Sequence, residues 1–273
     1  MKKSLRYREL TADVRRVVVK IGSRVLVTRS GRPDIRRMRA LIDDMSALRQ
    51  DGKELAVITS GAIAAGTEAL GMSSRPTSLP ELQMAAAVGQ CRLMSKYSEL
   101  FLRRNLKVGQ VLLTHADFQH KIRLNNARRT LDSLLRHGVV PVINENDVVA
   151  DEEIKADLAL GDNDLLAALV VKMIRADMLI ILSTVDGLRA PDARGRTRRV
   201  TYVETINRAV MRLVSPHKAG GLSKGGMESK LRAAQMASKA GCTVVIANGR
   251  KDGILSAVMR GEDVGTLILA GAG

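Results

Sequence analysis

Hydrophobic positions along this chain follow two spacings, one typical of buried strands and one typical of helices. Short runs rich in Val, Ile and Leu predict strands, and longer segments with apolar residues every three or four positions predict helices. Strands are predicted at about residues 14–21, 55–58, 108–113, 139–143, 178–182, 243–247 and 266–269. Helices are predicted at about residues 35–48, 62–70, 82–101, 125–136, 165–174, 205–214, 227–240 and 254–259.

The strands and helices alternate along the chain, and this order predicts one α/β domain with a mostly parallel sheet and helices on both faces. The domain is expected to span residues 14–273, after a basic tail at residues 1–13. Residues 185–199 predict a basic turn region with a short hairpin. Because ligands of such folds bind at the carboxyl ends of the strands, polar residues there are the first candidates for a site.

Composition narrows the range of partners and compartments. Lys and Arg number 44 against 28 acidic residues, a net charge of +16 that favours anionic partners such as nucleotides, nucleic acids or acidic metabolites. An inert basic surface would give the same charge. Cys91 and Cys242 form no CxxC pair, so a reduced cytoplasmic protein is expected. The apolar runs are too short to cross a membrane, and the N-terminus has no secretory signal.

Lys20 stands at the end of the first predicted strand, directly after three valines. An ammonium group is costly in a buried strand unless it has a partner, and Gly22 lets a backbone or a phosphate come close. The stretch therefore favours a site where Lys20 meets an anion. The alternative is an edge-strand lysine whose side chain reaches water.

Further polar residues follow other predicted strands. Ser60, Gly61 and Ala62 form a strand-to-helix turn whose free N–H groups suit a carboxylate or a phosphate, although a serine helix cap would look the same. Asn144 and Ser183 also fall at strand ends, which places them at the same edge of the sheet.

Two loops carry charge or glycine. Residues 144–164 hold eight acids and one lysine, which suits an amine or hydrated Mg²⁺, or else an exposed acidic loop followed by a helix cap. Residues 220–230 form a glycine loop that runs into a helix and could wrap a phosphate. It does not have the Walker A spacing, and an ordinary surface loop could have the same composition.

Taken together and in this order, these stretches resemble the amino-acid kinase family over about residues 17–269. The matching segments are residues 18–23, 59–66, 86–90, 140–147, 161–164 and 225–227, with Lys230. The resemblance implies a three-layer αβα sandwich, with the substrate on its N-terminal part and the nucleotide on its C-terminal part. It also implies transfer of the γ-phosphoryl group of MgATP to the side-chain carboxylate of glutamate, the first step of proline synthesis.

The resemblance also implies a role for each matching position. Glutamate would be bound by Ser60, Gly61, Ala62, Asp147 and Asn163, and ATP by Lys20, Ser183, Thr184, Lys224, Gly225, Gly226, Met227 and Lys230. Lys20 and Lys230 would stabilise the transferring group, and Asp164 would hold the two lysines in place. No metal site formed by protein ligands is expected, since Mg²⁺ would arrive with ATP. Feedback inhibition by proline, a dimer or tetramer, and no membrane contact are further expectations.

The sequence departs from the family pattern in two places. Ser183 and Thr184 stand where the family's nucleotide turn has Thr and Asp, and the residues up to Gly273 leave no room for the RNA-binding-type (PUA) domain of many bacterial members. Three alternatives stay open. One is a family kinase acting on acetylglutamate, aspartate, carbamate or UMP, and another is a catalytically weakened regulatory homologue. The third is a nucleic-acid-binding protein, against which stand only three Tyr and two Phe and no RNA-binding signature.

Overall fold

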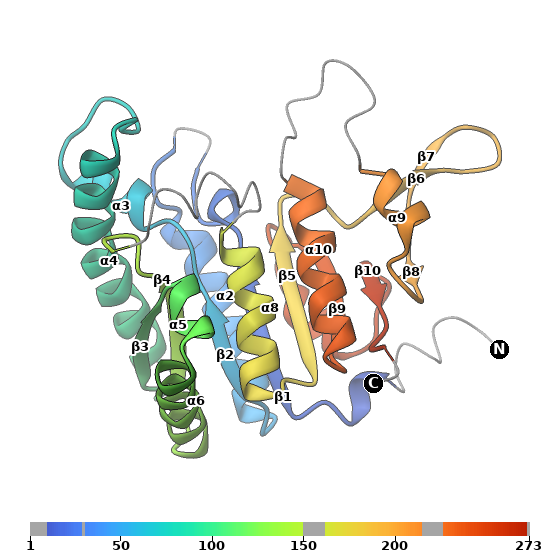
Figure 1. Ribbon diagram of the computed structural model, residues 1–273, viewed down its shortest axis with the longest axis horizontal. Coiled ribbons are helices and arrows are strands. Elements are labelled where there is room, and N and C mark those ends of the chain that lie inside the picture. The colour runs from blue at the N-terminus through green and yellow to red at the C-terminus, as the bar shows by residue number, and fades with distance from the viewer. Residues whose placement is uncertain (1–9, 29–30, 150–161, 215–225, 272–273) are drawn as a thin grey trace.

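The structure is a computed structural model that describes residues 10–28, 31–149, 162–214 and 226–271. Its centre is an eight-stranded sheet in the order β3-β4-β2-β1-β5-β9-β10-β8 (Figure 1). The strands in that order are β3 (Val108–Leu113), β4 (Val140–Glu145), β2 (Glu54–Ile58), β1 (Arg16–Ile21), β5 (Met178–Ser183), β9 (Thr243–Asn248), β10 (Gly265–Ile268) and β8 (Tyr202–Val203). All neighbours from β3 to β9 pair in parallel, and β10 runs antiparallel to β9.

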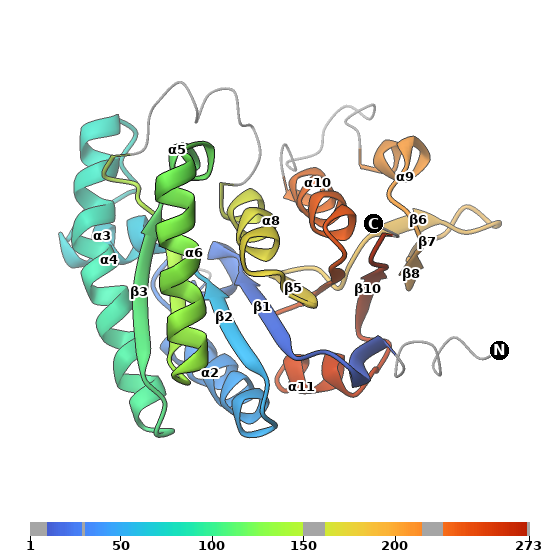
Figure 2. The same ribbon diagram turned by 60° about the horizontal axis from the view of Figure 1, so that its bottom comes forward.

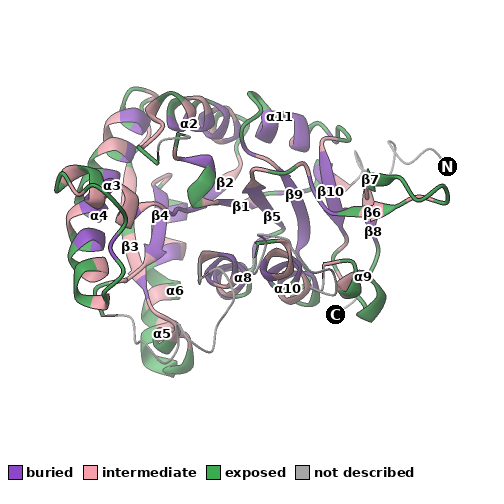
Figure 3. Ribbon diagram, turned by 90° about the horizontal axis from the view of Figure 1, so that it is seen from above, coloured by how far each residue is buried: buried purple, intermediate pink, exposed green. Residues whose placement is uncertain are grey.

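Helices cover both faces of this sheet, so the expected three-layer αβα architecture is confirmed (Figures 2 and 3). One face packs against α2 (Ile35–Gln50), α4 (Leu79–Leu102) and α11 (Ile254–Met259), and the other against α6 (Lys121–Arg136), α8 (Asp162–Ile174) and α10 (Gly226–Lys239). The shorter elements are η1 (Ser23–Val25), α3 (Ala62–Ala69), α5 (His115–Gln119), α9 (Arg208–Arg212) and the hairpin of β6 (Arg189–Pro191) and β7 (Thr197–Arg199).

Strand β1 lies in the middle of the sheet and contributes to both hydrophobic cores. Val17, Val19 and Ile21 pack into the core under α2, α4 and α11, whereas Val18 packs into the core under α6, α8 and α10. Successive side chains of a strand point to opposite faces. Lys20 therefore shares the face of Val18 and is directed toward α8 and α10. Its strand is central and the residue is only 5% exposed, so the edge-strand alternative is wrong.

Several predicted boundaries differ from the structure. Strand β4 continues past Ile143 to Glu145, because pairing with β3 carries the ladder through Asn144 whatever its polarity. The helix predicted at 205–214 is only the short α9, and the two-residue strand β8 before it is set by pairing with β10. The tail expected at residues 1–13 is also too long, because Leu10 packs against the core and Thr11 is buried.

Candidate active site

Two lysines from opposite ends of the chain meet on one carboxylate at the carboxyl edge of the sheet. Lys20 Nζ lies 2.6 Å from Asp164 Oδ1, and Lys230 Nζ lies 3.0 Å from Asp164 Oδ2. Lys20 comes from β1, Asp164 from the first turn of α8, and Lys230 from the first turns of α10. The structure thus brings together the three residues that the resemblance to a kinase family had singled out for catalysis.

Asp164 is almost fully enclosed, with 1% of its surface exposed. Besides the two lysines, it accepts a hydrogen bond from Ser229 Oγ at 2.6 Å. Burial by itself raises the pKa of Asp164, but the charges of Lys20 and Lys230 and the hydrogen bonds it accepts outweigh burial, and the net pKa lies below its usual value. Asp164 is therefore an anion at neutral pH and holds both ammonium groups near it.

A second polar group lies at the same edge and links four elements by hydrogen bonds. Asn163 Nδ2 donates to Ser60 Oγ at 3.0 Å and to Asn144 Oδ1 at 3.2 Å. Asn144 Nδ2 in turn donates to Gln90 Oε1 at 2.8 Å. Ser60, Asn144 and Gln90 are all buried. Because Asn163 and Asp164 are neighbours on α8, this amide group adjoins the lysine pair.

The turn of residues 59–62 is held in place from behind by two helices. Gly61 has a φ of +103°, a conformation that favours glycine, and it begins α3. Behind the turn, Thr59 Oγ1 and the buried hydroxyl of Tyr97 on α4 are 2.8 Å apart. Burial raises the pKa of Tyr97, which keeps the phenol protonated and able to hydrogen-bond. The N–H groups at the start of α3 can therefore be presented in a fixed position to an anion.

The residues expected to bind ATP lie on the other side of β1. Ser183 ends β5, Thr184 follows it, and Gly226 and Met227 open α10. A side chain at Gly22 would press on the carbonyl oxygen of Leu182, 3.1 Å from the Cβ position, so the close approach of these two strand ends depends on glycine. Lys224 and Gly225 lie outside the described residues, as does most of the acidic loop.

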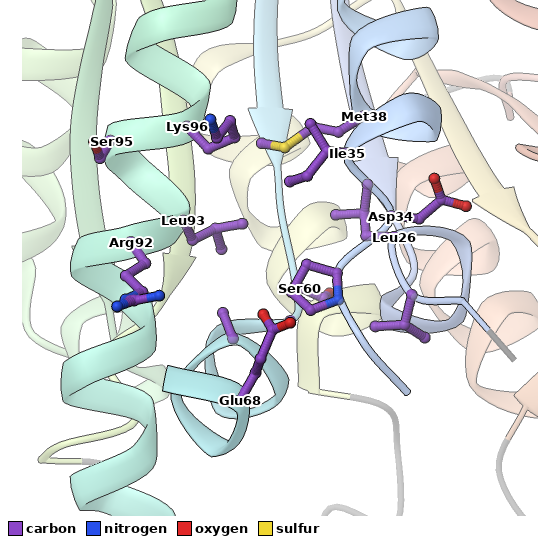
Figure 4. A pocket seen from close by; sticks show the side chains of 14 residues that line it. Leu26, Asp34, Ile35, Met38, Ser60, Glu68, Arg92, Leu93, Ser95 and Lys96 are labelled. Carbon is purple, nitrogen blue, oxygen red and sulfur yellow. The ribbon is translucent and has the colours of Figure 1, made fainter. Parts of the chain in front are cut away.

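A pocket of about 290 Å³ opens beside the turn, on the face of α2 and α4 (Figure 4). Leu93 and Arg92 line it from α4, Leu26 and Met38 line it from the opposite side, and Glu68 reaches it from α3. It touches Ser60 and Gly61 but neither lysine of the Asp164 cluster. The pocket thus borders the expected substrate turn from behind and does not contain the lysine–carboxylate centre.

Two side chains at this edge were missed by sequence reasoning. Ser229 donates to Asp164, and Gln90 accepts from Asn144. Gln90 did leave a signal, because it is a polar residue at the end of the run of small residues 86–90 on a helix predicted to be buried. Ser229 left none, since a serine between Glu228 and Lys230 on a helix is unremarkable until α8 lies beside it.

The architecture and this edge define a class of phosphoryl-transfer protein. A family model described as the amino acid kinase family matches residues 15–248, and the chain belongs to that family. Among solved structures, it is similar to carbamate kinase from Giardia lamblia bound to AMP-PNP, with a TM-score of 0.63 and 14% identity over 95% of this chain and 99% of that one. UMP kinase from Bacillus anthracis gives a TM-score of 0.60 and 15% identity over 95% and 97%. At these identities the two likenesses show the fold alone.

Sequence relatives are more particular. The chain is 43% identical to glutamate 5-kinase of Pelobacter propionicus over 264 residues, which are 96% of this chain and 69% of that protein. Glutamate 5-kinase of Citrifermentans bemidjiense is 44% identical over the same shares, and that of Marinomonas sp. is 43% identical over 95% and 68%.

Proposed function

We propose that this chain is an ATP-dependent kinase that phosphorylates the side-chain carboxylate of L-glutamate, the first step of proline biosynthesis. The observation that carries the proposal is the convergence of Lys20 and Lys230 on Asp164, next to an amide-lined turn, in a chain so similar to glutamate 5-kinases. Activity toward glutamate rather than acetylglutamate, aspartate, carbamate or UMP is favoured because these relatives are named as glutamate 5-kinases.

The reaction brings two anions together, and the two lysines meet that demand. Each pair of unit charges 4 Å apart repels by about 4 kcal/mol at an effective dielectric constant of 20. Lys20 and Lys230 would offset this repulsion and stay close to the phosphoryl group as its charge moves toward the leaving oxygen. Asp164 would keep the two ammonium groups from spreading apart before ATP binds.

The substrate needs no general base. A glutamate side chain has a pKa of about 4.3, so its carboxylate is already ionised at neutral pH. A carboxylate oxygen attacks the γ-phosphorus, the bond from that phosphorus to the β,γ-bridging oxygen breaks, and ADP leaves. The product is an acyl phosphate. Ser60, the N–H groups of Gly61 and Ala62, Asp147 and Asn163 are the proposed glutamate ligands.

ATP would lie on the C-terminal part, over Ser183, Thr184, Gly226 and Met227, with Lys224 and Gly225 from the glycine loop. Within the described part of the chain, no group of three or more His, Cys, Asp or Glu side chains could hold a metal. Asp164 is occupied by lysines, so Mg²⁺ would be carried chiefly by the phosphate oxygens of ATP, as is usual for this ion. When bound, it neutralises phosphate charge.

The remaining proposals concern the setting of the enzyme. We expect a cytoplasmic homo-oligomer, a dimer or a tetramer, that proline inhibits. Among the helices described, none is long and apolar enough to cross a bilayer. Cys91 and Cys242 are both free thiols, as expected for a reducing compartment. Light scattering would give the oligomeric state, and assays with added proline would test inhibition.

The test of the main proposal is a coupled assay of ADP formation with glutamate, aspartate and N-acetylglutamate. We expect ADP release that depends on glutamate, with an acyl phosphate that hydroxylamine traps as the hydroxamate. ADP release only with another acceptor would replace glutamate by that acceptor. Release with none of them, from a protein with intact secondary structure, would favour the regulatory homologue.

A further inference from the structure

Gln90 is a buried amide that the proposed reaction does not yet use. It lies on α4 and is 8% exposed, and its Oε1 accepts from Asn144 Nδ2 at 2.8 Å. Burying an amide is costly unless its polar atoms are hydrogen-bonded. Its position in the second shell of polar groups behind the expected glutamate site therefore calls for a functional explanation.

The hydrogen bonds around Gln90 form a chain with a direction. Asn163 donates to Asn144 and to Ser60, and Asn144 donates to Gln90. At one end, Asn163 Oδ1 is buried and has no hydrogen-bond partner among the described residues. At the other end, Gln90 Nε2 is likewise buried without a described partner. Each amide has one carbonyl and one NH₂, so the direction of the chain decides which atom Asn163 leaves for a ligand.

We infer that Gln90 is a positioning residue for the amino-acid substrate and acts through Asn144 and Asn163. The inference rests on the proposed function and adds to it. With Gln90 as acceptor, Asn144 turns its NH₂ toward α4 and its carbonyl toward Asn163. Asn163 then uses its NH₂ within the protein and keeps its carbonyl oxygen for a donor. The donor that a glutamate molecule supplies is its α-ammonium group.

The packing of α4 explains why Gln90 can hold this direction. The preceding residue, Gly89, lies so close to α3 that an added Cβ would be 1.8 Å from Ala62 O and 2.4 Å from Gly66 N. The backbone before Gln90 is thus pressed against the helix that begins at the substrate turn. Gln90 cannot withdraw from Asn144 unless the two helices separate.

The test compares two variants at position 90. Gln90→Met keeps the length of the side chain but cannot accept a hydrogen bond from Asn144, whereas Gln90→Glu keeps an acceptor oxygen. In Gln90→Met we expect the KM for glutamate to rise about tenfold, the effect of one lost hydrogen bond. The kcat and the KM for ATP should stay close to wild type, and Gln90→Glu should retain most of the glutamate affinity. Gln83→Met, on the same helix but outside the amide chain, is the matched control.

Glutarate, which has the carbons and carboxylates of glutamate but no ammonium group, separates positioning from general damage. Its inhibition constant against glutamate should be unchanged in Gln90→Met. An equal loss of glutarate and glutamate affinity, or an unchanged KM for glutamate, would overturn the inference. If Gln90→Met does not fold, a tenfold weaker KM in a folded Gln90→Glu would overturn it instead. A wild-type protein without glutamate-dependent activity would overturn the proposed function first, and the inference with it.

Discussion

At the scale of single residues, the chemistry of the site depends on how burial is balanced by charge. Asp164 is 1% exposed, yet it stays ionised because two lysines face its two oxygens. Lys20 is equally dependent on Asp164, since its stem rises from the middle of a buried sheet. Neither charge would be stable there alone. The residues that we propose to handle phosphate therefore also hold each other in place.

The first prediction concerns Lys230. Replacing it by methionine keeps the bulk of the side chain and removes the ammonium group that faces the phosphoryl group in our proposal. We expect Lys230→Met to lower kcat on the order of 100-fold or more, because the lost interaction is strongest in the transition state. Steady-state kinetics with saturating ATP and glutamate would measure it, with Lys239→Met on the exposed end of α10 as the control. An unchanged kcat would remove Lys230 from the mechanism.

The second prediction concerns stability and pH at Asp164. Asp164→Asn leaves two buried lysines without their anion, and we expect a loss of about 3–5 kcal/mol in the free energy of unfolding at pH 7. The pKa of Asp164 is lowered in the folded protein. Its stabilising effect is therefore fully present above the unfolded pKa of about 3.9 and is lost as the pH falls through the folded value.

Urea unfolding of both proteins between pH 7 and pH 3 would measure this difference. The gap between them should be constant above about pH 5 and should narrow by about 1 kcal/mol at pH 3. Asp13→Asn, at an exposed position, serves as the control. A gap that widens on acidification would mean that the folded pKa of Asp164 is raised rather than lowered.

At the scale of elements, the contact between α3 and α4 decides where the substrate turn lies. Gly66 faces the backbone of Ala85 and Gly89 faces that of Ala62, each with no space for a Cβ. The two helices can therefore approach almost backbone to backbone. This close packing carries Gln90 and Tyr97 of α4 to the rear of residues 59–62. A loop of ordinary surface residues could not be held as firmly.

The third prediction follows from this contact. Gly89→Ala places a methyl group 1.8 Å from a carbonyl oxygen of α3, so the helices must separate. We expect a loss of about 2–3 kcal/mol in the free energy of unfolding, typical of an overpacked interface, together with a higher KM for glutamate. Chemical denaturation and kinetics would measure both effects. Met84→Ala, exposed on the same helix, should change neither, and a Gly89→Ala protein as stable as wild type would contradict the proposed packing.

At the scale of the whole molecule, one sheet joins two hydrophobic cores. The core under α2, α4 and α11 and the core under α6, α8 and α10 share β1 and β5, whose side chains alternate between them. The N-terminal and C-terminal parts of the chain are also joined across the sheet by Asp44 of α2, which accepts from Leu255 N at 2.7 Å and from Ser256 Oγ at 2.5 Å on α11. Substrate and nucleotide sides thus belong to one body.

The fourth prediction tests that unity. Val18 and Val19 are adjacent on β1, both fully buried, and each contacts a different core. Val18→Ala and Val19→Ala should each lower the midpoint of the same unfolding transition, by an amount on the order of 2 kcal/mol. Circular dichroism and ANS fluorescence would follow the transition. A second, separate transition in either variant would show that the two faces unfold independently.

The net charge of +16 concerns the whole molecule as well. The arginines of the hairpin at 189–199 motivated the nucleic-acid alternative. In the structure Arg189 pairs with Asp186, Arg196 and Arg198 pair with Asp192, and Arg199 pairs with Asp263. Much of that basic segment is therefore neutralised locally, which weakens the case for an RNA-binding surface there.

Much of the fold could be predicted from the sequence, because the apolar spacing of strands and helices depends on residues near one another in the chain. Helices α2, α10 and α11 and strands β1, β3 and β5 begin and end within two residues of the predicted positions. The misses share a cause. The extension of β4 through Asn144 and the strand β8 depend on pairing with distant strands, and local pattern carries no information about such pairing.

The sequence by itself determined the alternation of strands and helices, the polar residues at the strand ends, and the glycine turns, since each follows from local periodicity and residue chemistry. Only the tertiary structure decided that Lys20 and Lys230, 210 positions apart, face the two oxygens of one buried carboxylate. It also decided that Ser229 and Gln90 support that centre. The reason is physical. Whether a polar side chain is solvated or held in a buried network depends on what packs beside it, and those neighbours come from other parts of the chain.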